Sequence, residues 1–366
     1  MSEHRGEARP AWPKSQRDRP GSGIWQCVRE YGRTTRQFLR PLPAAGPHAP
    51  LPPPLPDGRI VYIPGRGETM VREAPGPGGG PAVVLLHGWT LSADLNWFTG
   101  VYEVATRHGH MVAPDIRGHG RGLRSEEPFT LQAAADDVAG LLRELGLGPA
   151  VLVGYSMGSS IALLMAHTNP DVVAGLVLAS SGLQWRASLY ERALWGALAG
   201  VEYVLRFGAP EGITDRYLRH AVHQSPDLGP YRSWLKAEAR RGDASDIAAA
   251  GRQLANYDAG ALAEGVDVPT VVVVTRHDLL IRAHKQRQLA KVIGARTVEV
   301  DGAHNAWMVK PVEFAQAIDE GLGIVLGELG HDTTPLTEED EDALGPRGVP
   351  AASSPRRPDA LGITSL

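Results

Sequence analysis

The stretch from Val151 to His167, VLVGYSMGSSIALLMAH, decides the fold. A short apolar strand runs into Gly154-Tyr155-Ser156-Met157-Gly158, and an apolar helical segment follows directly. This order is typical of a nucleophile elbow, in which a sharp turn projects the serine hydroxyl and the two glycines let the strand and the helix approach each other. The stretch therefore predicts an α/β fold with Ser156 at the carboxyl edge of the sheet.

Short apolar runs alternate with helical patterns on both sides of this stretch. RIVYI and TMVREA, at residues 59–63 and 69–74, predict a hairpin. Further strands are expected in PAVVLLHG, HMVAPD, AVLVG, VAGLVLAS, TVVVVT and RTVEVDG, and helices over 130–145, 157–168, 283–292 and 311–328. Because these strands are apolar on both faces, we expect a mostly parallel central sheet flanked by helices.

The ends of the 366-residue chain differ from its centre. Residues 1–56 predict an N-terminal extension made of a short amphipathic helix and a linker, since eight of the sixteen residues 41–56 are proline. The basic face of that helix suits peripheral lipid contact, but docking on the main domain is the favoured interpretation. Residues 331–366 carry seven acidic residues against three arginines, and we expect a disordered acidic tail.

The central part divides into a core over 57–182 and 244–330 and an insertion over 183–243. The insertion has a helical, densely apolar pattern, and a structureless loop of that length would be unusual in a compact domain. It follows the carboxyl end of a strand, where open α/β sheets bind their ligands. We therefore expect a helical cap over the site.

Composition limits the function classes. A net charge of −4 gives no overall field for a polyanion, so no nucleic-acid partner is expected. The longest apolar runs, such as Val271–Val274, are far shorter than the roughly 20 residues of a membrane span. The start lacks the apolar core of a signal peptide, and Cys27 is the only cysteine, which excludes an intrachain disulfide. A cytoplasmic protein without a membrane span is expected.

A serine hydroxyl is a weak nucleophile unless a base takes its proton and an acid orients that base. Candidates follow Ser156 in the chain, each at a predicted strand end: TVVVVT leads to Asp278, and RTVEVDG leads to His304. The order Ser, Asp, His is the one expected after a nucleophile elbow. Ser156, Asp278 and His304 are thus predicted to form a catalytic triad. His277 is the nearest alternative base, but it lies on the acid's own loop and is not favoured.

Negative charge on a reacting carbonyl oxygen also needs hydrogen-bond donors. Leu85-Leu86-His87-Gly88-Trp89 ends the strand expected beside the elbow strand. The backbone amide of Trp89 can pair there with the amide of Met157 at a helix N-terminus, and together they are predicted to form an oxyanion hole. His87 is given no proton-transfer role.

Five motifs of the chain stand in the order seen in one family. They are LLHGWT, Asp115-Ile116-Arg117-Gly118-His119-Gly120, the elbow, Asp278 and Asp301-Gly302-Ala303-His304. Over about residues 57–328 the chain resembles α/β-hydrolases of the esterase, lipase and cofactor-free haloperoxidase-like branch. The resemblance implies an α/β-hydrolase fold, the triad and oxyanion-hole roles just given, and a loop-organising role for Asp115 and Arg117. The chain departs from the family pattern at Ser159, directly after the elbow, where many relatives carry a second glycine following Gly158.

The leading hypothesis is a serine hydrolase that cleaves carboxylic esters with small to medium apolar acyl groups, without a metal or organic cofactor. Perhydrolase or haloperoxidase-like chemistry and carbon–carbon bond hydrolysis on the same triad are alternatives, and a non-catalytic small-molecule receptor is less favoured. An elbow carboxylate, which dehalogenases and epoxide hydrolases of this fold use, is replaced here by Ser156. Five aromatic residues near strand ends or the cap junction indicate an apolar acyl pocket, although each alone is equally consistent with ordinary core: Trp89, Trp97, Phe98, Trp185 and Trp307.

Overall fold

The computed structural model describes residues 52–186, 191–192 and 226–331. Eight strands of this part form one sheet in the order β1-β2-β4-β3-β5-β6-β7-β8. The strands are β1 (Asp57–Ile63), β2 (Gly67–Ala74), β3 (Val83–Leu86), β4 (Met111–Pro114), β5 (Ala150–Tyr155), β6 (Val173–Ala179), β7 (Thr270–Thr275) and β8 (Arg296–Val300). β1 and β2 form an antiparallel hairpin, β2 is antiparallel to β4, and every other pair is parallel.

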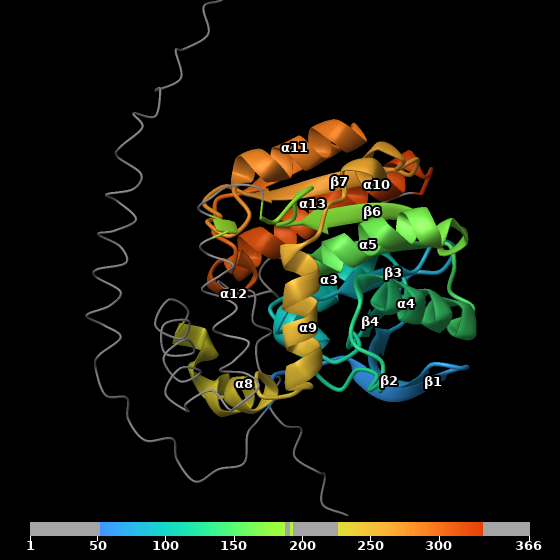
Figure 1. Cartoon of the computed structure of the whole chain (residues 1–366), viewed down its shortest axis with the longest axis vertical. Coiled ribbons are helices and arrows are strands. Elements are labelled where there is room, and N and C mark those ends of the chain that lie inside the picture. The colour runs from blue at the N-terminus through green and yellow to red at the C-terminus, as the bar shows by residue number, and fades with distance from the viewer. Residues whose placement is uncertain (1–51, 187–190, 193–225, 332–366) are drawn as a thin grey trace, which may run out of the picture. The chain divides into compact units, whose positions relative to one another are not determined.

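Helices cover both faces of the sheet. Figure 1 shows α4 (Leu131–Leu145), α5 (Met157–Thr168), α10 (Gly260–Glu264) and α11 (Ala283–Ile293) arranged along one face, and they contact one another there. The other face carries α2 (Ala93–Trp97), α3 (Val101–His108), α12 (Ala306–Val309) and α13 (Pro311–Glu328). Each face has its own hydrophobic core cluster. This is the layered, mostly parallel architecture predicted from the two-sided apolar strands.

Burial explains the strand patterns. All residues of β3, β5 and β7 are buried, as expected for parallel strands with helices on both sides. The edge strand β1 is exposed over its first four residues and alternates only at its end, and Ile60 and Tyr62 are its exposed apolar side chains, 56% and 59% accessible. Because β3, β5, β6, β7 and β8 pair in parallel, their carboxyl ends lie at one edge of the sheet.

Local signals explain where several helices begin and end. Thr130 caps α4 by accepting a hydrogen bond from the Ala133 amide, and Gly146 ends the helix in the left-handed conformation, with φ 65°. Asp243 caps α9 (Ala244–Ala255) by accepting from the amides of Ser245 and Asp246. These side chains satisfy helix-end groups that would otherwise lack partners.

The four helices predicted from sequence are confirmed as α4, α5, α11 and α13. Sequence reasoning did not specify the short α2, α3, α10 and α12, nor α9, which lies just after the predicted end of the insertion. Of the insertion over 183–243, the described parts are residues 183–186, 191–192 and 226–243, with a 3-10 helix (Pro226–Tyr231) and α8 (Arg232–Glu238). The remainder of the predicted cap, most of the N-terminal extension and nearly all of the acidic tail lie outside the described residues.

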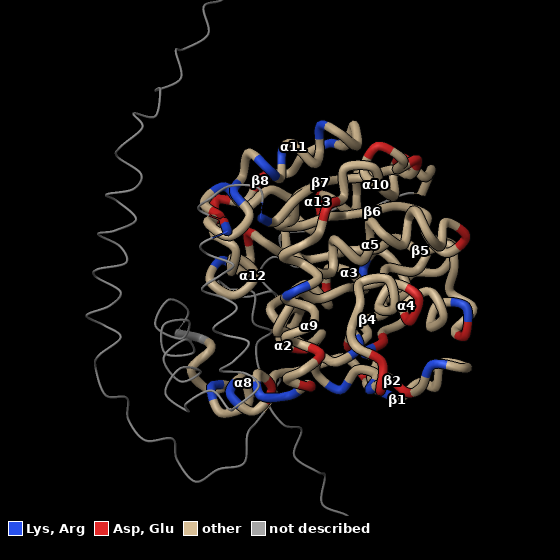
Figure 2. The backbone as a smooth tube through the Cα atoms, viewed as in Figure 1, with Lys and Arg blue, Asp and Glu red and all other residues tan. Residues whose placement is uncertain are grey.

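Figure 2 shows acidic and basic residues interspersed along the backbone of the described part. This mixture matches the small net charge of −4. None of the helices in the ranges given above is both long and apolar enough to cross a bilayer.

Candidate active site

Ser156 is the single residue between β5 and α5, and its backbone has φ 53° and ψ −112°. Two glycines make this turn sterically feasible. A Cβ atom on Gly154 would lie 2.5 Å from the Cα atom of Ser159, and one on Gly158 would collide with the carbonyl oxygen of Leu86. The hydroxyl of Ser159 is accommodated at this contact because it donates a hydrogen bond to the Gly154 carbonyl oxygen, at 2.7 Å. The close approach predicted for the elbow is present.

Side chains from the ends of three strands meet at this turn. The Ser156 hydroxyl oxygen lies 3.1 Å from Nε2 of His304, and Nδ1 of His304 lies 2.7 Å from Oδ2 of Asp278. Ser156 follows β5, Asp278 follows β7 and His304 follows β8. Ser156 and Asp278 are each 3% exposed. This geometry allows the imidazole to take a proton from the hydroxyl while the carboxylate orients the ring.

The surroundings of Asp278 determine which nitrogen of His304 carries the proton. Oδ1 of Asp278 accepts hydrogen bonds from the amides of Leu280 and Ile281, at 2.8 and 2.9 Å. Oδ2 accepts from the Thr275 hydroxyl at 3.0 Å. Because an ionised carboxylate only accepts, Nδ1 of His304 must donate to it, and Nε2 of the neutral ring is then left to accept from Ser156.

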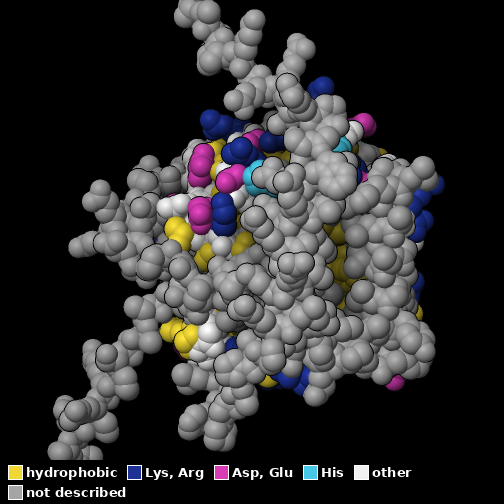
Figure 3. Space-filling view, turned by 90° about the vertical axis from the view of Figure 1, so that its left-hand side faces the viewer, with side chains coloured by type: hydrophobic (Ala, Val, Ile, Leu, Met, Phe, Trp, Pro, Cys, Tyr) yellow, Lys and Arg dark blue, Asp and Glu magenta, His cyan; other side chains and the backbone are white. Residues whose placement is uncertain are grey.

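His277, the alternative base, has a different partner. Its Nε2 lies 2.7 Å from Oδ1 of Asp301, and its side chain is 63% exposed. Hydrogen bonds from His277 and Lys310 lower the pKa of Asp301. These residues belong to an exposed charged group, and Figure 3 shows acidic, basic and histidine side chains adjoining one another on this side of the molecule. The structure pairs His304, not His277, with Ser156.

The loop after β3, from His87 to Leu91, lies beside the elbow because β3 pairs with β5. Nε2 of His87 accepts from the Ile116 amide at 2.9 Å, so Nδ1 carries the proton and donates to the Gly88 carbonyl, also at 2.9 Å. The Gly88 amide donates to the buried side chain of Asn96 at 2.9 Å. The loop that carries the Trp89 amide is thereby held on both sides, and His87 acts as a neutral brace.

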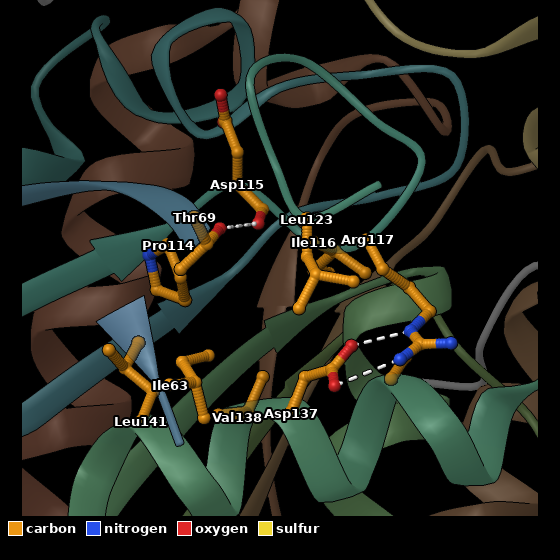
Figure 4. A pocket seen from close by; sticks show the side chains of 11 residues that line it. Ile63, Thr69, Pro114, Asp115, Ile116, Arg117, Leu123, Asp137, Val138 and Leu141 are labelled. Carbon is orange, nitrogen blue, oxygen red and sulfur yellow. Dashed lines mark hydrogen bonds and ion pairs between the residues drawn. The ribbon is translucent and has the colours of Figure 1, made fainter. Parts of the chain in front are cut away.

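Asp115 and Arg117 organise a second loop. The Asp115 carboxylate accepts from the amides of Ala93 and Arg121, both at 2.7 Å, and Arg117 forms an ion pair with Asp137 on α4. Figure 4 shows this ion pair beside a small cavity and the Asp115 carboxylate pointing away from the cavity. The cavity measures about 10 Å³, room for one water molecule at most, so it cannot hold an acyl group.

Side chains at the end of the insertion and in the helix after it contact the core near the site. Glu238 of α8 is 2% exposed and pairs with the Arg121 guanidinium through two contacts of 2.8 Å. The indole of Trp89 donates to the carbonyl of Ile247 on α9 at 2.7 Å. A Cβ atom on Gly251 of α9 would lie 2.6 Å from this indole. α8 is therefore anchored to the loop after β4, and α9 to the loop after β3.

Four of the five aromatic residues expected near an acyl pocket are buried in the core clusters: Trp97, Phe98, Trp185 and Trp307. Phe98 packs edge-on against Trp234, with ring centroids 5.2 Å apart, and Trp97 packs edge-on against Tyr155 at 6.4 Å. Trp89 is the one residue of these five that is partly exposed. These contacts fit ordinary core packing, and the acyl pocket remains a prediction.

The family is identified by the sequence comparison. The model described as alpha/beta hydrolase family matches residues 83–317, well over half of the chain and including every residue of the candidate triad. The chain belongs to the alpha/beta hydrolase family.

Individual relatives are similar over shorter stretches. Lipase LipV of Mycobacterium tuberculosis is 33% identical over 129 residues, which cover 35% of this chain and 48% of that protein. The bifunctional esterase/perhydrolase DCH of Acinetobacter calcoaceticus is 36% identical over 107 residues, 29% of this chain and 38% of its own length. The chain thus spans less than half the length of these relatives.

Solved structures match more of the fold. A thermophilic esterase from Thermogutta terrifontis superposes with a TM-score of 0.60 at 26% identity, over 74% of this chain and 99% of that one. Together with the family match, this likeness supports the α/β-hydrolase fold that the ordered motifs predicted.

The sequence did not reveal the residues that support the candidate triad and the loop beside it. Gln286 of α11 is fully buried, and its side-chain nitrogen lies 3.2 Å from Oδ2 of Asp278 and 2.9 Å from Oγ1 of Thr275. A signal existed, since Gln286, Leu289 and Ala290 occupy one helical face and a glutamine stands on an otherwise apolar stripe. Asn96 had no comparable signal, because α2 was not predicted.

Acid is expected to destabilise the fold through two fully buried histidines. Burial lowers the pKa of His87 to about 3 and the pKa of His119 to about 4. The unfolded chain takes up these protons below about pH 6.5 while the folded protein does not, so stability falls on acidification by about 1.4 kcal/mol per pH unit for each ring. Burial raises the pKa of Asp115 to about 6, so this carboxyl makes the folded protein more stable on acidification. The loss of stability from the two histidines exceeds that gain.

His119→Asn tests this effect. Asparagine keeps a donor near the place of Nδ1, which lies 3.0 Å from the Arg117 carbonyl oxygen, and it does not titrate. We expect the loss of unfolding free energy between pH 7 and pH 5 to shrink by up to about 2 kcal/mol, measured by urea unfolding at both pH values. An unchanged loss would contradict a neutral, buried His119.

Proposed function

We propose that this protein is a serine hydrolase that cleaves carboxylic esters through an acyl-enzyme on Ser156. The single observation that carries the proposal is the hydrogen-bonded chain from the Ser156 hydroxyl through His304 to Asp278, with distances of 3.1 and 2.7 Å. These distances are within the range over which a base takes a proton from a nucleophile. The hydroxyl also stands at the exit of a strained turn, which serves chemistry rather than packing.

In the proposed reaction, the Ser156 oxygen bonds to the ester carbonyl carbon while its proton moves to Nε2 of His304. The amides of Trp89 and Met157 donate to the carbonyl oxygen as it becomes negative. The tetrahedral intermediate expels the alcohol, which takes the proton from His304, and leaves the acyl group on Ser156. Water repeats these steps, yields the acid and restores the serine. Every step uses residues of the chain, so no cofactor is needed.

The relatives support this chemistry. A lipase and an esterase/perhydrolase are among the proteins that this chain resembles. The latter makes perhydrolysis the second candidate, in which peroxide replaces water in attack on the same acyl-enzyme. Both candidates share the first half-reaction, and the ratio of acid to peracid formed with peroxide present separates them.

The proposed substrate is a small molecule with a small to medium apolar acyl group. Support comes from α9, which borders the loop after β3: its Ile247 carbonyl accepts from the Trp89 indole, and Ala249, Ala250 and Leu254 belong to the apolar cluster against which Trp89 packs. An enclosed apolar site would desolvate the acyl chain and favour longer chains until the space is filled.

Ser156→Ala is expected to abolish ester hydrolysis without unfolding the protein. Deleting a triad nucleophile costs up to about 10⁶-fold in kcat. The measurement is kcat for p-nitrophenyl butyrate, with Ser160→Ala as the matched control, because Ser160 is also buried and lies one turn further along α5. A Ser156→Ala variant that keeps more than about a tenth of the wild-type kcat would refute the nucleophile assignment.

Acyl-chain length tests the apolar pocket. Each methylene buried in the transition state is worth about 0.8 kcal/mol, close to a fourfold gain in kcat/KM. For p-nitrophenyl acetate, butyrate, octanoate and palmitate, we expect kcat/KM to rise from acetate to a medium chain and then to fall. A monotonic decrease from acetate onward would show that the cap closes the site instead of lining an acyl pocket.

A further inference from the structure

Tyr155 stands between Gly154 and the proposed nucleophile, at the end of β5. Its side chain is almost wholly buried, with 2% exposed, and its hydroxyl donates a hydrogen bond to the backbone carbonyl of His304. The residue directly before the serine therefore contacts the loop that carries the proposed base. This contact joins two segments 149 residues apart in the chain.

The Tyr155 ring contacts the two other parts of the site. Its centroid lies 5.4 Å from that of the His304 imidazole, in a tilted arrangement. A Cβ atom on Gly88 would lie 2.8 Å from the Tyr155 ring, so the loop after β3 passes directly over it. Trp97 and Phe314 pack edge-on against the same ring, at 6.4 and 5.9 Å. The ring is thus held firmly in place, and its hydroxyl has a defined direction.

The loop of His304 needs such support. It joins β8 to the four-residue helix α12 beyond the last β7–β8 pair, and one backbone hydrogen bond, from the His277 amide to the Gly302 carbonyl at 2.9 Å, ties it to the loop after β7. Side-chain hydroxyls hold carbonyl groups of the loop and of the helix after it: Tyr155 donates to the carbonyl of His304 in the loop, and Thr99 donates to the carbonyl of Trp307 in α12 at 2.6 Å. The placement of the imidazole therefore depends on side chains of the core as well as on Asp278.

We propose that the Tyr155 hydroxyl is a positioning group for the base: it fixes the His304 backbone relative to Ser156. The inference rests on the proposed function, since it assigns His304 the role of base for Ser156. The hydrogen bond from the Tyr155 hydroxyl to the His304 backbone holds His304 Nε2 at its distance of 3.1 Å from Ser156 Oγ. The hydroxyl bonds the backbone carbonyl of His304 and not the imidazole, so its loss is expected to affect proton transfer and to leave substrate binding unchanged.

Tyr155→Phe removes this hydroxyl and keeps the ring. The variant is expected to fold, because losing one buried hydrogen bond costs about 1–3 kcal/mol against a typical stability of about 5–15 kcal/mol. We expect kcat for p-nitrophenyl butyrate to fall about tenfold with KM within about twofold of wild type, since small misplacement of a catalytic group is costly. The rate of Ser156 modification by a fluorophosphonate, which expels fluoride and needs no ester, should fall by the same factor.

Tyr102→Phe is the matched control. Tyr102 is also 2% exposed, and its hydroxyl donates to Asp94 at 3.2 Å on the same face of the sheet. The same atom is removed there, so a comparable loss of thermal stability is expected with kcat and labelling rate within about twofold of wild type.

Two results would overturn the positioning role. One is a Tyr155→Phe variant whose kcat and labelling rate stay within about twofold of wild type. The other is an equal loss of rate in Tyr102→Phe, which would show that rate only follows stability. If wild-type protein reacts with the fluorophosphonate at Ser156 but turns over no ester, the proposed function fails, and the labelling rates still decide the role of Tyr155.

Discussion

The rest of the site depends on one backbone constraint, the close approach of α5 to β5 and β3 at the elbow. Gly154 and Gly158 leave no room for a Cβ atom at this contact, and Ser156 between them has a positive φ of 53°. Such a conformation in a non-glycine residue costs about 1–3 kcal/mol and persists only where surrounding packing enforces it. The Ser156 amide is held to the Ala179 carbonyl at 2.8 Å, so the neighbouring strand enforces it here. The strain directs the hydroxyl to the edge where β7 and β8 end.

Polar groups at this edge are oriented mainly by backbone amides and buried side chains. Asp278 is held by two amides and by Thr275, and this fixes the tautomer of His304. The loop after β3 is held in the same way through His87 and Asn96. Burial keeps His87 neutral, so it braces the loop without adding a charge beside the carbonyl oxygen of a substrate. Rigid support of this kind suits catalysis, because it places dipoles before the reaction begins.

Much of this arrangement was predictable from sequence. Two-sided apolar strands and the elbow pentapeptide specify a parallel sheet whose carboxyl ends lie together, so residues following three separate strands had to converge. The convergence of Ser156, Asp278 and His304 was predicted in this way, and their catalytic roles stay a prediction. The contacts that the sequence did not predict depend on tertiary packing. Gln286 reaches Asp278 only because α11 docks on β7, and Tyr155 reaches His304 only through the loop before α12. The short helices α2, α3, α10 and α12 have too few turns to show a clear period.

The central claim is that Ser156 becomes covalently acylated during turnover. Acid quenching of the wild-type enzyme within the first turnovers of p-nitrophenyl butyrate, followed by peptide mass spectrometry, measures this directly. A butyryl group is expected on Ser156, formed before the acid product appears and absent in Ser156→Ala. Ester turnover without an adduct, or with the acyl group on another residue such as Ser160, would contradict it.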